Sequence, residues 1–251
     1  MADFKYKRIL LKLSGEAIAD KKEGGIFDRS IIEKIACVIK ELTEGGVQVG
    51  IVIGAGNIWR GAYGVGVKRA RADHMGMLGT MINCLRMEDA LEKNGCRPIV
   101  MSPIQVNSMA EPYDFRRAIS YLEDGRVVLF GCGTGVPFVS TDTTAVIRAA
   151  EIEADIILMA KNVDGVYDRD PNKKGNENTA KKYKTISYEK CLVDGLHATD
   201  TSASALAEEQ AIDMYVFGLA QPESILEVVR GDELGTFVSH DRSVEAVFYE
   251  N

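Results

Sequence analysis

The chain has few of the residues that mark secreted, metal-binding or membrane-spanning proteins. Its five cysteines, at positions 37, 84, 96, 132 and 191, form no Cys-x-x-Cys pair and no Cys/His spacing typical of a metal site. Reduced thiols in a cytosol are the simplest interpretation. The apolar run Ile9-Leu10-Leu11 near the N-terminus is far too short for a signal peptide or a membrane span. We therefore expect a cytoplasmic protein with no membrane contact and no metal site of its own.

Positive charge is also scarce. The chain has 30 Lys and Arg residues against 37 Asp and Glu, so its formal net charge is −7 and its pI is near 5.2. Binding a nucleic acid requires a basic surface, and we expect no such partner. A hydrophobic content of 46% and a charged content of 27% describe a globular chain with an ample core.

Apolar runs of strand length alternate with helix-length segments along the chain. We interpret the following runs as buried strands: Arg8–Leu13, Val47–Ile53, Pro98–Met101, Val127–Phe130, Asp155–Met159, Met214–Phe217, Phe237–Val238 and Val244–Phe248. Asp28 and Asp73 are expected to open helices, Pro222–Val229 to form another, and Asp168 to Lys184 to form a surface loop. The alternation predicts an α/β fold, a three-layer αβα sandwich with a mostly parallel central sheet. Because no segment has the composition of a linker, we expect a single domain over residues 1–251.

Ligands of parallel sheets bind beyond the carboxyl ends of the strands, so the residues after each strand are the first candidates for a site. Lys12-Leu13-Ser14-Gly15 ends the first run, and Ile53-Gly54-Ala55-Gly56-Asn57, followed by Arg60, ends the second. Glycine-lined turns with a lysine or an arginine suit phosphate oxygens. Taken alone, a lysine in the position of Lys12 is more often a solvated charge at a strand end. Neither a Walker A motif nor a dinucleotide fingerprint is present.

The most informative stretch is Thr134–Ala145, which follows the run Val127–Phe130. Glycines and a proline end the strand, and Ser140, Thr141 and Asp142 are favoured caps for the next helix. Free N–H groups and the dipole at a helix N-terminus favour a phosphate. An ordinary capped helix needs the same residue types, so this segment alone leaves both interpretations open.

Three further segments each allow a structural and a functional interpretation. Lys161–Tyr167 predicts a tight Asp-Gly turn with a return strand, either a plain hairpin or a site in which Asn162, Tyr167 and Asp170 hold a nucleotide. Asp73 caps a helix or accepts hydrogen bonds from a sugar hydroxyl, and the neighbouring His74 is interpreted as structural. Asp200 opens a helix from Thr201 to Gln210 and is either a cap or a catalytic carboxylate.

Taken together, these motifs resemble the amino-acid-kinase superfamily and, within it, the bacterial uridylate kinases, which transfer phosphate from ATP to UMP. The resemblance covers essentially the whole chain, from Tyr6 to Thr236. The motifs that carry it occur in the expected order and at the expected separations: Lys12–Gly15, Gly54–Asn57 with Arg60, Asp73–Leu78, Thr134–Asp142 and Lys161–Pro171. The ordered set is far more specific than any single motif.

The resemblance implies a role for each matching residue. ATP contacts are implied for Lys12, Leu13, Ser14, Gly15, Gly56, Arg60, Asn162, Tyr167 and Asp170. UMP contacts are implied for Ala55, Asp73, Thr134, Gly135, Val136, Pro137, Phe138, Val139, Ser140 and Thr141. The catalytic candidates are Lys12, Arg60, Asp142 and Asp200. The N-terminal part would mainly bind UMP, and the part from about residue 160 would mainly bind ATP.

The resemblance also implies Mg²⁺ carried by ATP, a homohexamer, inhibition by UTP and, in most members, activation by GTP. Two residues depart from the family pattern. Val136 replaces the usual asparagine of Thr-Gly-Asn-Pro-Phe, which leaves only backbone contacts at that position. Ala55 replaces the central glycine of a Gly-Gly-Gly-Asn turn, and its methyl group requires a negative φ.

Two other functions fit the same residues. One is a kinase of this fold that acts on carbamate, acetylglutamate or aspartate, and the other is a non-catalytic protein that binds nucleotides or oxyanions. The Thr-Gly-x-Pro-Phe loop and Asp73-His74-Met75 favour UMP over the small carboxylates. The presence of Lys12, Arg60, Asp142 and Asp200 favours an enzyme over a binding protein.

Overall fold

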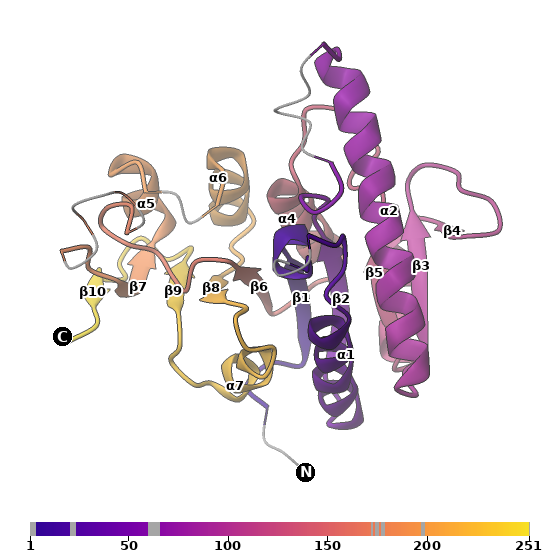
Figure 1. The fold of residues 1–251 in the computed structure, drawn as a ribbon. Helices are drawn as coiled ribbons and strands as arrows, with labels where there is room; N and C mark the ends of the chain where they lie inside the picture. The colour runs from indigo at the N-terminus through magenta and orange to yellow at the C-terminus, as the bar shows by residue number, and fades with distance from the viewer. Residues whose placement is uncertain are drawn as a thin grey trace.

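The computed structural model describes residues 4–20, 24–59, 66–171, 173, 176, 179–196 and 199–250. One ten-stranded sheet runs through the described residues, with the strand order β10-β7-β9-β8-β6-β1-β2-β5-β3-β4 (Figure 1). The strands are β1 (Arg8–Leu13), β2 (Gln48–Ile53), β3 (Pro98–Ser102), β4 (Glu111–Pro112), β5 (Val127–Phe130), β6 (Ile156–Lys161), β7 (Tyr183–Ser187), β8 (Met214–Gly218), β9 (Thr236–Ser239) and β10 (Val247–Phe248).

Most neighbouring strands are parallel. The central four, in the order β6-β1-β2-β5, are all parallel to one another. Among the named strands, only β8 with β9 and β7 with β10 pair in the antiparallel direction. This arrangement confirms the predicted α/β fold, because a parallel connection needs a crossover that places a helix on one face of the sheet.

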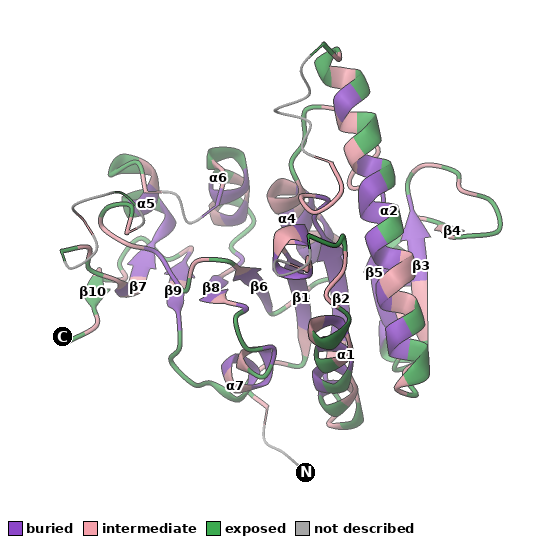
Figure 2. Ribbon diagram, in the orientation of Figure 1, coloured by how far each residue is buried: buried purple, intermediate pink, exposed green. Residues whose placement is uncertain are grey.

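Helices cover both faces of the sheet. They are α1 (Arg29–Glu44), α2 (Arg69–Lys93), α3 (Phe115–Glu123), α4 (Thr141–Glu151), α5 (Tyr188–Val193), α6 (Thr201–Glu209) and α7 (Ser224–Arg230), and a short 3-10 helix spans Gly15–Ala17. Helices α1, α2 and α7 pack on one core cluster, and α3 to α6 pack on the other. Alternate residues of β1 divide between the two clusters, with Leu11 in the first and Leu10 in the second. Figure 2 shows the buried strands between the helices.

Several predicted helix starts are confirmed at the level of single atoms. The side chain of Asp28 accepts a hydrogen bond from the amide of Ile31 at the start of α1, and Gly45 ends that helix. Ser140 caps α4 and Asp200 caps α6 in the same way. These caps satisfy amide groups that have no partner within the helix.

Two predictions are wrong. Asp73 does not open a helix, because α2 begins at Arg69 with Lys68 as its N-cap, and Asp73 lies in the second turn. The hairpin expected at Lys161–Tyr167 does not form either, since Tyr167 pairs with Lys182 in an isolated antiparallel bridge. Strand β7 and helix α5 were not predicted. Tyr183 and Lys184 of the expected loop belong to β7, so the loop ends earlier than expected.

Candidate active site

The carboxyl ends of β1, β2, β5 and β6 lie at one edge of the sheet, as their parallel pairing requires. The turns after β1 and β2 are in direct contact. A Cβ atom at Gly15 would lie 2.4 Å from the carbonyl oxygen of Gly54 and 2.7 Å from the amide nitrogen of Gly56, so only glycine fits there. The glycines of the two motifs therefore serve one compact turn cluster.

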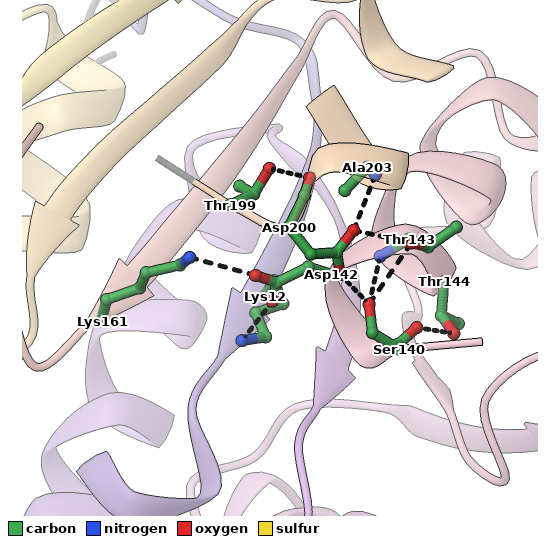
Figure 3. Close-up of polar contacts among 9 residues, drawn as sticks. All are labelled: Lys12, Ser140, Asp142, Thr143, Thr144, Lys161, Thr199, Asp200 and Ala203. Carbon is green, nitrogen blue, oxygen red and sulfur yellow. Dashed lines mark hydrogen bonds and ion pairs between the residues drawn. The ribbon is translucent and has the colours of Figure 1, made fainter. Parts of the chain in front are cut away.

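Asp142 lies between two lysines at this edge (Figure 3). The Nζ atom of Lys12 on β1 is 2.6 Å from one carboxylate oxygen of Asp142, and the Nζ atom of Lys161 on β6 is 3.0 Å from the other. All three side chains are largely buried, with exposed fractions of 9% for Lys12, 16% for Asp142 and 18% for Lys161. The three residues, which we call the lysine–aspartate cluster, carry a net charge of +1 when all are ionised.

Burial and charge act in opposite directions on this cluster. Burial alone would raise the pKa of Asp142, but the ammonium groups of Lys12 and Lys161 outweigh it and hold that pKa well below its usual range. Burial lowers the pKa of Lys161, and the attraction of Asp142 only partly opposes this because Lys12 shares the same carboxylate. Asp142 is therefore a fixed anion at neutral pH, and the net positive charge of these three residues favours an anionic ligand nearby.

Asp200 lies beside the N-terminus of α4. Its carboxylate caps α6 by accepting a hydrogen bond from the amide of Ala203 at 2.8 Å. The same carboxylate accepts hydrogen bonds from the hydroxyl groups of Ser140 and Thr143. Asp200 thus joins the starts of α4 and α6, so capping and placement at the site are compatible roles for one residue.

A cavity of about 210 Å³ opens next to the start of α4. We call it the first cavity. Its walls come from the turn after β2, the first turns of α2, and the loop of residues 131–140. The predicted UMP contacts among its lining residues are Ala55, Asp73, Thr134, Val139, Ser140 and Thr141. Trp59, Arg69 and Thr80 also line it and were not predicted.

The 131–140 loop takes an unusual backbone conformation. Cys132, Gly133, Gly135 and Phe138 all have a positive φ, and two of these are not glycine. Asp73 accepts a hydrogen bond from the amide of Phe138 at 2.9 Å, which ties the loop to α2. The side chains of Val136 and Phe138 are 59% and 69% exposed. Gly135, Val136, Pro137 and Phe138 therefore lie at the outer part of the loop and not on the cavity wall.

The methyl group of Ala55 requires a negative φ. Ala55 meets this condition, because the described non-glycine residues with a positive φ do not include it. Its methyl group faces Gly79 of α2, where an added Cβ atom would lie only 2.9 Å away. The turn is further held by Asn83, a fully buried residue of α2 that the sequence did not single out. Asn83 donates to the carbonyl oxygen of Gly54 at 2.7 Å and exchanges amide hydrogen bonds with Asn57.

Three of the residues predicted to hold ATP, Asn162, Tyr167 and Asp170, follow the end of β6. Asn162 donates to Glu16 at 3.0 Å, and the hydroxyl group of Tyr167 donates to Asp164 at 2.7 Å. A second cavity of about 240 Å³ is lined by Ala17, Ala19, Asp28, Ile31, Lys161, Asn162, Leu219 and Ala220. We call it the second cavity. Asp170 lies at the exposed surface.

The remaining predicted ATP contacts belong to the turns after β1 and β2. The side chain of Leu13 is fully buried in the core, so only its backbone faces the turn. The amide of Ser14 donates to the carbonyl oxygen of Ala160 at 3.2 Å, and an added Cβ atom at Gly56 would lie 3.2 Å from Glu16. Arg60 lies outside the described residues.

Lys161 is the main residue of this site that the sequence analysis did not assign. Like Lys12, it is a lysine at the end of an apolar strand, and that shared position was the available signal. Within the described part of the chain, no group of three or more His, Cys, Asp or Glu residues is placed to hold a metal ion. None of the helices described there combines the length and apolar character needed to cross a membrane.

The amino acid kinase family model matches residues 7–218. The chain belongs to the amino acid kinase family. The match includes the lysine–aspartate cluster, Asp200 and the lining of the first cavity. The family assignment made from the ordered motifs is thereby confirmed.

Solved structures of this family extend the likeness over nearly the whole chain. A structure described as the UMP kinase of Bacillus anthracis is 38% identical, covers 98% of this chain and 99% of its own, and superposes with a TM-score of 0.90. The UMP kinase of Ureaplasma parvum is 37% identical over 94% of this chain and 99% of its own, with a TM-score of 0.87. The uridylate kinase of Archaeoglobus fulgidus is 28% identical over 92% and 99%, with a TM-score of 0.69.

Proposed function

We propose that this chain is a UMP kinase, which transfers the γ-phosphate of ATP to UMP and forms UDP and ADP. The observation that carries the proposal is the position of the lysine–aspartate cluster between two cavities. Lys161 lines the second cavity, while Thr141, the residue before Asp142, lines the first. Two buried cations at such a junction suit a phosphoryl group passing from one nucleotide to another. The similar UMP kinases of two bacteria support the choice of acceptor.

UMP would occupy the first cavity and ATP the second. Asp73, Ala55 and the 131–140 loop would then contact UMP, and the turns Lys12–Gly15, Gly56 and Arg60 would contact the phosphates of ATP. Asn162, Tyr167 and Asp170 would hold the adenosine part. In this arrangement residues 1–251 form one domain, whose N-terminal part mainly binds UMP and whose part from about residue 160 mainly binds ATP.

The reaction needs no general base from the protein. An oxygen of the UMP phosphate is already anionic near neutral pH and would attack the γ-phosphorus in line with the leaving group. Lys12 and Lys161 would stabilise the charge on the transferring group, and Asp142 would hold both lysines in place. Asp200 accepts a hydrogen bond from Ser140 and would thereby fix the start of α4, where Ser140 and Thr141 would face the UMP phosphate.

Magnesium would enter with ATP and neutralise part of the charge on its phosphates. The donor set fits such a shared ion better than a dedicated cage. Asp142 is already paired with two lysines, and Asp200 already accepts three hydrogen bonds. Asp142 or Asp200 would hold a magnesium ion only together with the phosphates of ATP, and the ion would neutralise part of their charge.

The 131–140 loop would select uracil over cytosine through its backbone groups. Uracil presents O4 and N3–H where cytosine presents an amine and an unprotonated N3, so a site paired with one leaves polar groups unpaired with the other. Each unpaired group costs roughly 1–3 kcal/mol. We expect CMP to be a much poorer acceptor than UMP.

The proposed enzyme would work as a cytoplasmic homohexamer, inhibited by UTP and activated by GTP. One feature of the described surface supports assembly. Met75, Leu78 and Ile82 of α2 are exposed apolar residues at helical spacing, with exposed fractions of 38%, 54% and 46%. A second copy of the chain would cover this stripe.

A coupled assay of UDP formation from UMP and Mg-ATP tests the proposal. We expect the wild-type protein to form UDP from UMP and the Lys12→Ala variant to lose this activity. The loss would also show that the activity does not come from a contaminating kinase. The same assay with carbamate, acetylglutamate or aspartate detects the small-acceptor alternative, and repeats with CMP, UTP and GTP measure selectivity and control. UMP binding by calorimetry without any UDP formation would point to the non-catalytic protein instead.

A further inference from the structure

Arg148 of α4 is a buried arginine that the reaction described above does not use. Its side chain is only 4% exposed, and its Nε atom is buried without a hydrogen-bond partner, so keeping this guanidinium group in the interior has a cost. One terminal nitrogen is 2.5 Å from a carboxylate oxygen of Glu151, one turn later on the helix. The guanidinium group of Arg148 lies over the ring of Tyr113, with 3.6 Å between the guanidinium carbon and the ring centroid.

The other terminal nitrogen of Arg148 donates to the carbonyl oxygen of Gly133 at 3.1 Å. Gly133 lies in the 131–140 loop, lines the first cavity, and has a positive φ of 60°. Its neighbour Cys132 also has a positive φ, although it is not glycine. A strained backbone of this kind persists only when the surrounding side chains fix it.

Between residues 132 and 138 the loop is fixed by side chains from two helices. Thr80 of α2 accepts a hydrogen bond from the amide of Cys132, Asp73 of α2 accepts one from the amide of Phe138, and Arg148 donates to the carbonyl oxygen of Gly133 between them. The hydrogen bonds of Asp73 and Arg148 are both charge-assisted, and Arg148 alone of the three binds a loop carbonyl. Tyr113 also donates to Glu151, so the aromatic ring and the carboxylate that hold Arg148 are themselves connected.

We propose that Arg148 is a positioning residue for the UMP site, which holds the 131–140 loop in its binding conformation through the carbonyl oxygen of Gly133. Tyr113 and Glu151 keep the guanidinium aimed at that carbonyl. This inference rests on the proposed UMP kinase function for the identity of the ligand. The placement of the loop by Arg148 is independent of that identity.

The test compares Arg148→Met and Arg148→Lys with Arg8→Met. Arg8 is a matched control, because its side chain is 11% exposed and it donates to the carbonyl oxygen of Ile152, the C-cap of α4, at 2.6 Å, instead of to the 131–140 loop. We measure KM for UMP and for ATP, kcat, the thermal midpoint, and the hydrogen exchange of amides 132–138 without substrate.

Arg148→Met should raise KM for UMP roughly 10-fold or more, change KM for ATP and kcat less than about two-fold, and speed exchange in the loop. Arg148→Lys should recover part of the loss. Arg8→Met should lower the thermal midpoint but leave KM for UMP and the loop exchange unchanged. If Arg148→Met does not fold, Arg148→Lys and Tyr113→Phe carry the test, each with a smaller rise in KM for UMP.

The inference would be overturned if folded Arg148 variants exchanged the amide hydrogens of the loop at the wild-type rate. It would also be overturned if KM for UMP and KM for ATP rose equally. If the wild-type protein forms no UDP from UMP, the proposed function is overturned instead. The hydrogen-exchange measurement then still decides the role of Arg148. Wild-type activity together with an unchanged KM for UMP in Arg148→Met would overturn this inference alone.

Discussion

The 131–140 loop follows β5 and the turn of residues 162–167 follows β6, with β1 and β2 between these strands, and the two segments are held in different ways. The loop has a strained backbone, and its anchors are side chains of α2 and α4. The inner end of the turn is held by a buried hydrogen bond from the amide of Val166 to Thr236, but its outer end is held by exposed contacts, such as Lys182 to Asp164, whose side chain is 58% exposed. In the proposed arrangement this contrast gives a preorganised acceptor side and a donor side whose outer residues are more adaptable.

The contrast has a chemical reason. The acceptor phosphate must be aligned with the phosphorus to within a fraction of an ångström, so its loop gains from rigid anchors. In the proposed arrangement ATP would bring its own charge and metal and would meet several glycine turns, so its base and ribose would need less exact support. Substitutions in the cluster should affect turnover, whereas substitutions on either side should affect KM for one nucleotide only.

The largest effect is expected at the centre of this comparison. Lys12→Ala removes the cation that is 2.6 Å from Asp142 and faces both nucleotides in the proposed arrangement. Turnover at saturating UMP and ATP should fall on the order of 100- to 1000-fold, as when one preorganised donor to a developing anion is lost. Steady-state kinetics measure this, and near-normal turnover would show that Lys12 has no role in the transfer.

Lys161→Met should have a smaller effect, because Lys12 still neutralises Asp142. Turnover should fall roughly 10- to 100-fold, the cost of one charged hydrogen bond. Burial lowers the pKa of Lys161 below the ordinary lysine value of about 10.4, so wild-type kcat should decline as that proton is lost on the alkaline side.

The pH profile separates a catalytic Lys161 from a structural one. The pKa of Lys161 is lower in the folded protein than in the unfolded chain. Lys161 therefore loses its ammonium proton at a lower pH than a free lysine does. In Lys161→Met the alkaline decline of kcat should move to higher pH, because the titrating group is gone. The same decline in both proteins would assign it to another group and leave Lys161 with a structural role only.

How much of this site the sequence predicts depends on how local the deciding interaction is. Ser140 and Asp200 were identified because a cap acts on amides two or three residues away. Lys161 was not assigned, because its charge matters only once β6 lies beside β1 and Asp142 lies between them. Asn83 gave no signal at all, since an asparagine within a helix shows nothing of the turn that it holds.

The same distinction explains the fold. Strands β1 and β5 were bounded correctly, because their apolar runs end in charged or glycine residues. The start of α2 was misplaced because Arg69–Ala72 has no residue that prevents a helix, so the helix extends past Asp73. Tyr167 was paired with the wrong strand, because its partner Lys182 lies beyond a long polar stretch that turn chemistry alone does not predict.

Tyr167→Phe sharpens the comparison on the donor side. Burial and the nearby Asp164 carboxylate raise the pKa of Tyr167 to about 12, so its hydroxyl group is a protonated donor at neutral pH. Losing this hydrogen bond should raise KM for ATP about 3- to 10-fold and leave KM for UMP unchanged. A rise in KM for UMP of the same size would mean that the two sides are not independent.

The smallest effect is expected at Val136, on the exposed outer part of the 131–140 loop. Val136→Asn restores the amide found at this position in the family pattern and should lower KM for UMP about 2- to 5-fold, the value of one modest hydrogen bond. Val193→Asn is a matched control, because Val193 is also an exposed valine, at 79%, but lies at the end of α5 and outside the 131–140 loop. An unchanged KM for UMP in Val136→Asn would mean that the loop binds through its backbone alone. Its fixed conformation, and not its side chains, would then account for the affinity of the acceptor side.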